Sequence, residues 1–171
     1  QLIRPLRKPL IIMSPKSMLR LKESVSSLED LAQGHFYPVI SETENLDPDK
    51  VARYTDKKLE KILLDERIIR NRLKVFAART NARAYLEMQD QGIDFSQHLW
   101  SFVNGKPIVN KLRLITDFQA TSPISDALSK DLKKRGFTFV GSTIVYAFMQ
   151  AVGMYNDHLV TCFRHEEVKK A

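Results

Sequence analysis

The chain has 171 residues, 43% of them hydrophobic and 27% charged, which is the composition of an ordinary globular domain with a core of its own. No apolar run approaches the roughly 20 residues of a membrane-spanning helix, and residues 1–12 lack the apolar centre and cleavage site of a signal peptide. The formal net charge of +7 fits an anionic partner such as DNA, although many basic proteins bind no nucleic acid.

Residues 1–44 differ from the rest of the chain in composition and in predicted secondary structure. They hold four of the seven prolines, a short apolar run at 10–13 that suits a buried strand, and at most one helical turn from Ser26 to Gly34. Their six Lys/Arg nearly balance five Asp/Glu, whereas residues 45–171 carry 21 against 15. We therefore predict two parts, an irregular segment at 1–44 that makes no domain by itself and a basic domain at 45–171.

From Asp47 onward, apolar residues recur at helical spacing. Asp47 and Thr55 are predicted to cap two short helices, and the longest helix is predicted at 66–89, with an apolar stripe of Ile69, Leu73, Phe76, Ala77, Thr80, Ala84 and Leu86. Further helices are expected at 95–103, 125–134 and 142–152, with a short turn near Leu114. Because no strand pattern of period two appears after Asp47, we predict an all-α fold.

Residues 132–143 are predicted to form the end of one helix, an apolar loop with a glycine on each side, and the beginning of the next helix. Gly136 stands where a helix end favours a left-handed residue, and Gly141 lets the backbone approach a ligand closely. Ser142 and Thr143 then expose backbone N–H groups at a helix N-terminus, which attracts anions, with Lys134 and Arg135 nearby. This layout is typical of a helix-hairpin-helix that binds a DNA phosphate, but an ordinary turn between two helices with basic surface residues accounts for it equally well.

The only cysteine, Cys162, excludes an internal disulfide and favours a reducing compartment, so we expect a cytoplasmic protein. His158 stands four residues before it. On a helix, that spacing places an imidazole and a thiolate, both good zinc ligands, on one face. A structural zinc site needs four ligands, and the residues alone favour a buried cysteine beside a surface histidine.

Nine phrases in this order resemble the 3-methyladenine DNA glycosylase I family: DPDKVA (47–52), IIRNRLK (68–74), NARAYL (81–86), LWSFVN (99–104), SDALSK (125–130), LKKRGF (132–137), FVG (139–141), FMQA (148–151) and NDH (156–158). The resemblance spans residues from about 47 to 165. It implies a helix-hairpin-helix fold and hydrolysis of the N-glycosidic bond of alkylated adenine in base-excision repair, with alkylated double-stranded DNA as the partner. It also implies that residues 134–141 grip a phosphate and that His158 and Cys162 are two of four zinc ligands, half of the family's site.

The family's N-terminal motifs have no counterpart upstream of Asp47. Those motifs supply the other Cys and His zinc ligands, the base-recognising Glu and the stacking aromatic residues. We therefore expect impaired catalysis and weak zinc affinity or none, with either an inactive chimera or a non-specific DNA-binding module as the alternative.

The upstream segment has a resemblance of its own. PLIIMSPKS (9–17), SSLEDL (26–31) and GHFYPVI (34–40) resemble the thiamine-dependent subunit of 2-oxoglutarate dehydrogenase. This stretch is too short to build a thiamine diphosphate site, so no thiamine diphosphate is expected. A chimera joined near residues 42–48 is the leading interpretation.

Overall fold

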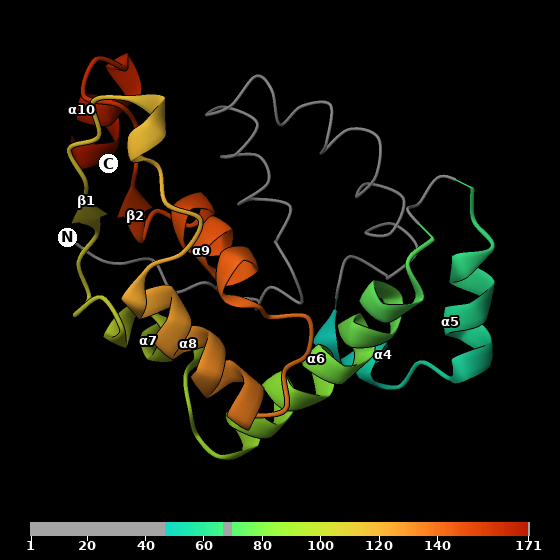
Figure 1. The fold of residues 1–171 in the computed structure, drawn as a ribbon. Helices are drawn as coiled ribbons and strands as arrows, with labels where there is room; N and C mark the ends of the chain where they lie inside the picture. The colour runs from blue at the N-terminus through green and yellow to red at the C-terminus, as the bar shows by residue number, and fades with distance from the viewer. Residues whose placement is uncertain (1–46, 67–69, 171) are drawn as a thin grey trace.

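The computed structural model describes residues 47–66 and 70–170. The predicted elements at 10–13 and 26–34, and His35, lie outside these residues. Seven α-helices dominate the described part, which confirms the all-α prediction: α4 (Pro48–Ala52), α5 (Asp56–Leu63), α6 (Arg72–Asp90), α7 (Phe95–Ser101), α8 (Pro123–Lys134), α9 (Ser142–Ala151) and α10 (Phe163–Lys170). In Figure 1, α5 lies at one end of these helices, and α10 lies at the other.

Two very short strands were not predicted. β1 (Ile108–Val109) pairs in parallel with β2 (Tyr155–Asn156), and a 3-10 turn, η2 (Ile115–Asp117), follows β1 near the predicted Leu114. Two residues are too few to show an alternating pattern, which is why the sequence does not reveal these strands. The pairing brings the loop after α7 against the segment after α9.

The predicted helix caps are confirmed. The side chain of Asp47 accepts a hydrogen bond from the N–H of Asp49 at 3.1 Å, and that of Thr55 accepts from the N–H of Lys58 at 3.2 Å. These bonds satisfy N–H groups that have no partner within the helix. Ser122 caps α8 in the same way, so α8 begins at Pro123 and not at residue 125.

The prediction for α6 was wrong in two respects. The helix begins at Arg72, because Asn71 caps it by accepting from the N–H of Lys74 at 3.1 Å. The predicted stripe is confirmed in part: Ala77 and Ala84 are buried, and Phe76 and Leu86 pack against the core. However, Leu73 is 72% exposed and Thr80 is exposed, whereas Val75 and Ala82, outside the stripe, are buried; Ile69 lies outside the described residues. A single stripe does not describe α6, because other parts of the chain cover it on more than one side.

Two apolar clusters make the core. One joins α4 and α5 to α6 through Val51, Leu59, Ile62 and Ala82. The other lies among α6, α7, α8 and α9 and includes the fully buried Leu128, Met149 and Met154. Each such buried side chain contributes about 1.5–3 kcal/mol. Since α6 belongs to both clusters, it fixes the α4–α5 end relative to the rest.

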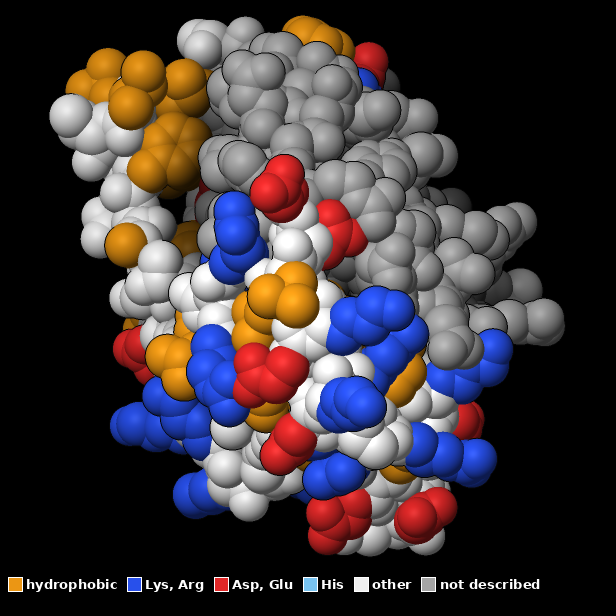
Figure 2. Space-filling view, turned by 90° about the vertical axis from the view of Figure 1, so that its right-hand side faces the viewer, with side chains coloured by type: hydrophobic (Ala, Val, Ile, Leu, Met, Phe, Trp, Pro, Cys, Tyr) orange, Lys and Arg blue, Asp and Glu red, His pale blue; other side chains and the backbone are white. Residues whose placement is uncertain are grey.

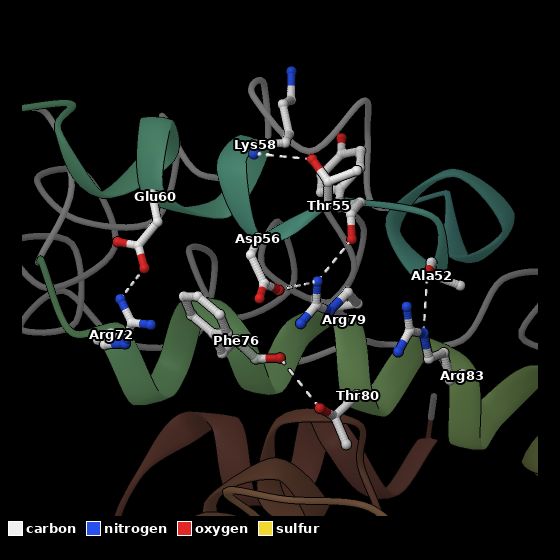
Figure 3. A network of polar contacts seen from close by, with 11 residues as sticks. Ala52, Thr55, Asp56, Lys58, Glu60, Arg72, Phe76, Arg79, Thr80 and Arg83 are labelled. Carbon is white, nitrogen blue, oxygen red and sulfur yellow. Dashed lines mark hydrogen bonds and ion pairs between the residues drawn. The ribbon is translucent and has the colours of Figure 1, made fainter.

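Arginine side chains of α6 reinforce the junction with α4 and α5 (Figure 3). Arg79 donates to the carbonyl of Tyr54 at 2.8 Å and pairs with Asp56 at 2.7 Å. Arg83 donates to the carbonyl of Ala52 at 2.9 Å, and Arg72 pairs with Glu60.

Of the helices described, none has both the length and the apolar character needed to cross a membrane.

Candidate nucleic-acid interface

The predicted hairpin joins α8 to α9. Gly136 has a φ of +87°, the left-handed conformation predicted for it, just after the C-cap residue Arg135. The N–H of Phe137 then donates to the carbonyl of Leu132 at 3.0 Å, which closes the end of α8. Phe137 is 6% exposed and stacks on Phe95 at 5.7 Å between ring centroids. The start of the loop is therefore anchored in the core.

Two buried side chains clamp the middle of the loop. Asn81 of α6 donates to the carbonyl of Thr138 at 3.0 Å and accepts from its N–H at 2.8 Å. Ser129 of α8 donates to the carbonyl of Val140 at 2.7 Å. Asn81 and Ser129 are 2% and 3% exposed. The residues on both sides of Phe139 are thus held in place.

Phe139 has a φ of +59°, which is uncommon for a residue other than glycine. Such a conformation costs about 1–3 kcal/mol and persists only where the surroundings impose it. The clamps on Thr138 and Val140 impose it here. Strained residues of this kind concentrate at functional sites, and the sequence gives no sign of this one.

The mouth of the hairpin is the N-terminus of α9. Gly141 is its N-cap, no side chain caps the helix, and a Cβ placed on Gly141 would meet no atom within 4 Å. The hydroxyl of Ser142 bonds that of Ser125 at 2.8 Å, and the backbone N–H groups of the first turn, which includes the exposed Thr143, are left without a side-chain cap. This arrangement suits an anion that approaches the backbone closely.

The basic residues before the loop are not equivalent. Lys134 is exposed, but Arg135 is paired through Nε with Asp131 at 2.8 Å. His98 of α7 contacts the same carboxylate oxygen at 2.7 Å. Burial opposes ionisation of Asp131, but hydrogen bonds from Arg135 and His98 outweigh it and lower its pKa. Asp131 therefore restrains Arg135 and offsets its charge.

His158 and Cys162 lie close together, though not on a helix. They stand in the turn between β2 and α10, with Nδ1 and Sγ 3.9 Å apart. The predicted proximity of the two side chains is confirmed, but the prediction that they lie on a helix was wrong. A tetrahedral zinc ion holds a nitrogen and a sulfur ligand about 3.5 Å apart, so these two donors fit half of a zinc site. Burial lowers the pKa of His158, assisted by Arg164 and His165, which favours the neutral imidazole that binds metals.

The neighbours of this pair are engaged elsewhere. His165 is 3% exposed, and its ring nitrogens contact the carbonyl of Asn110 at 3.0 Å and Glu166 at 3.1 Å. Within residues 47–66 and 70–170, no third histidine, cysteine or carboxylate completes a metal-binding group. The described residues therefore provide two donors of the four that a structural site requires.

Asp157 fixes the backbone beside His158. Its carboxylate accepts hydrogen bonds from Tyr146 at 2.7 Å, from Gln150 at 2.6 Å and from Asn110 at 2.6 Å. Burial and the nearby Asp157 raise the pKa of Tyr146. This buried network ties α9, β2 and the segment after β1 together and sets the position of the turn.

The sequence identifies the hairpin but not its supports. Asn81, Ser129 and Asp131 act through contacts that local spacing does not reveal, since Asn81 and Thr138 are 57 residues apart. The one available signal is a buried polar residue on an otherwise apolar helix face, because such a group needs a specific partner.

The chain is similar to methyladenine glycosylases over most of its length. The family model described as methyladenine glycosylase matches residues 39–165. "DNA-3-methyladenine glycosylase 1" of Escherichia coli K12 is 49% identical over 116 residues, which cover 68% of this chain and 62% of that protein. A crystal structure of 3-methyladenine DNA glycosylase I has a TM-score of 0.76 at 38% identity and covers 86% of this chain and 81% of its own.

A second similarity concerns a smaller part of the chain. The "2-oxoglutarate dehydrogenase E1 component" of Azotobacter vinelandii is 60% identical over 53 residues, which are 31% of this chain and 6% of that protein. The chain spans less than two thirds of the length of the E. coli glycosylase. The family model nevertheless matches most of the chain, and the chain belongs to the methyladenine glycosylase family.

Proposed function

We propose that the chain is a DNA-repair protein of the 3-methyladenine glycosylase type, which binds alkylated double-stranded DNA through the α8–α9 hairpin. The observation that carries this proposal is the uncapped N-terminus of α9 at Gly141, within the segment that the family model matches. Backbone N–H groups and Lys134 are the groups that bind a phosphate without reading a base.

The same proposal assigns site residues to the hairpin. Gly141, Ser142 and Thr143 offer the phosphate site, while Lys134 and Arg135 add positive charge and Gly136 shapes the turn. Charge alone does not locate this site: Figure 2, which views the end of the molecule that carries α5, shows acidic side chains between the basic ones there. The N-terminus of a helix supplies a directed anion site that such a mixed surface lacks.

Base excision by this chain is proposed to be weak. A methylated adenine is cationic and leaves readily, so an enzyme mainly has to extrude the base, stack it and recognise its edge. The sequence upstream of Asp47 carries none of the family phrases that supply those groups. The experiment is to incubate the chain with methylated duplex DNA and quantify free 3-methyladenine, with the E. coli relative as the reference. Release at a rate near that of the reference would contradict the proposal.

A second candidate is a DNA-binding module without base specificity, which the phosphate-directed geometry of the hairpin favours. The two candidates differ in the ratio of affinities for methylated and unmodified duplexes. A ratio near one, with affinity that falls steeply with salt, supports the module. Preference for the methylated duplex supports the glycosylase.

A further inference from the structure

The face of α6 that meets the hairpin carries Lys74 as well as Asn81. These residues are seven apart and so lie on one side of the helix. Asn81 holds Thr138, and the ammonium of Lys74 lies 5.6 Å from the ring centroid of the next residue, Phe139. This distance is typical of a cation–π contact.

In the described part of the chain, Lys74 has no carboxylate partner, whereas three nearby arginines are paired with carboxylates. Arg79 pairs with Asp56, Arg72 with Glu60, and Arg135 with Asp131. The side chain of Lys74 instead contacts the ring of Phe139. An aromatic ring orients an ammonium but leaves its full positive charge available to an anion.

The position of this charge follows from the loop. Phe139 precedes the N-cap Gly141 by two residues, a span of at most about 7 Å. Neighbouring phosphates of one DNA strand are separated by about 3.4 Å along the helix axis. A strand that contacts the N-terminus of α9 and continues past Phe139 would bring its next phosphate toward Lys74.

We propose that Lys74 binds a second DNA phosphate beside the one at the α9 N-terminus and that the ring of Phe139 positions its ammonium for this contact. The left-handed backbone of Phe139, imposed by the clamps on its two neighbours, gives the ring its place beside Lys74. This inference rests on the proposed function, because it presupposes that DNA binds at the hairpin. It adds a contact that orients the strand and reads no base.

The test is the salt dependence of binding to a labelled duplex, measured by fluorescence anisotropy over a series of KCl concentrations. Lys74→Gln is expected to reduce the slope of log K against log salt by about 0.9, the value for one lost phosphate contact. Lys74→Arg is expected to keep the slope. The matched control is Lys58→Gln, since Lys58 also lies over a ring, that of Tyr54 at 5.5 Å, but points away from α6 (Figure 3).

The role of the ring is tested separately. Phe139→Gly suits the left-handed backbone, so the loop keeps its shape while the ring is lost. We expect it to weaken binding as Lys74→Gln does, and the double variant to be no weaker than Lys74→Gln alone. Thermal unfolding and circular dichroism verify that each variant is folded, and if Phe139→Gly is not, the lysine variants still decide the question.

The outcomes separate the two proposals. If the unaltered chain binds no duplex at low salt, the proposed function fails. If the unaltered chain binds and Gly141→Ala weakens it, but Lys74→Gln leaves the slope unchanged, only the Lys74 inference fails. An equal loss of slope in Lys58→Gln would also overturn it, because the effect would then be one of net charge.

Discussion

The side-chain amide of Asn81 pairs with the backbone of Thr138 as one strand pairs with another. Its Nδ2 donates to the carbonyl at 3.0 Å, and its Oδ1 accepts from the N–H at 2.8 Å. Because Asn81 belongs to α6 and is almost fully buried, the hairpin is held by the central helix as well as by α8 and α9. The geometry of the proposed phosphate site therefore depends on a residue that does not line it.

Replacing Asn81 is expected to destabilise the fold and loosen the hairpin. In Asn81→Ala, the carbonyl and N–H of Thr138 lose the side chain that they bond, at a cost of about 1 kcal/mol for each lost hydrogen bond. Urea denaturation measures this loss. Asn81→Asp is a second comparison: it keeps an acceptor for the Thr138 N–H but turns a carboxylate oxygen toward the Thr138 carbonyl from a buried position, so it should destabilise the fold at least as much. An unchanged midpoint for Asn81→Ala would show that the clamp contributes nothing.

The two hairpin glycines are expected to separate stability from DNA binding. Gly136 has a φ of +87°, so Gly136→Ala forces a side chain into a left-handed backbone at a cost of about 1–2 kcal/mol. Gly141 has a φ of −61° and open space around its missing Cβ. Gly141→Ala costs less than about 1 kcal/mol as a poorer cap and recovers a similar amount by restricting the unfolded chain.

The two variants are expected to rank in opposite order for stability and for DNA affinity, when the affinity is compared at equal fractions of folded protein. The added methyl group of Gly141→Ala stands in the space through which a phosphate would approach the N–H groups of Ser142 and Thr143, so duplex affinity falls severalfold. Gly136→Ala lowers the unfolding temperature more. Anisotropy titrations and thermal unfolding of both variants measure these effects, and a Gly141→Ala protein with unaltered affinity would argue against the phosphate site.

Removing the carboxylate of Asp131 is expected to lower stability and strengthen DNA binding. Asp131→Asn breaks the ion pair with Arg135 and weakens the contact with His98, at a cost of about 1 kcal/mol for these partly exposed groups. It also frees the charge of Arg135 for a phosphate. Denaturant unfolding and duplex titration at one salt concentration test the two effects, and weaker binding by Asp131→Asn would contradict the second.

The stability that Asp131 contributes has a defined dependence on pH. Its folded pKa is lowered, so the unfolded chain takes up the proton first as the solution becomes acidic. The contribution is complete above the ordinary pKa of an aspartate, near 4, and is lost as the pH falls toward the lower folded value. The difference in unfolding free energy between the unaltered chain and Asp131→Asn should therefore be constant from neutral pH to about 5 and shrink below 4. A difference that grows in acid would contradict the assignment.

Local signals predicted local structure well. Asp47 and Thr55 cap helices because a cap depends on residues within one turn, and Gly136 is left-handed for the same reason. Part of the stripe on α6 was wrong because some of its buried positions are determined by contacts far along the chain. The strained backbone of Phe139 is imposed by Asn81 and Ser129, so the identity of residue 139 does not predict its positive φ.

The turn that carries His158 and Cys162 is expected to bind zinc weakly. Two donors 3.9 Å apart suit zinc, but His165 is held by Asn110 and Glu166, and a structural site takes four ligands. After dialysis against zinc and then against metal-free buffer, elemental analysis should find well under one zinc per chain. Any zinc taken up at high concentration should be lost in Cys162→Ser, which differs by one atom. A ratio near one in the unaltered chain would contradict this prediction.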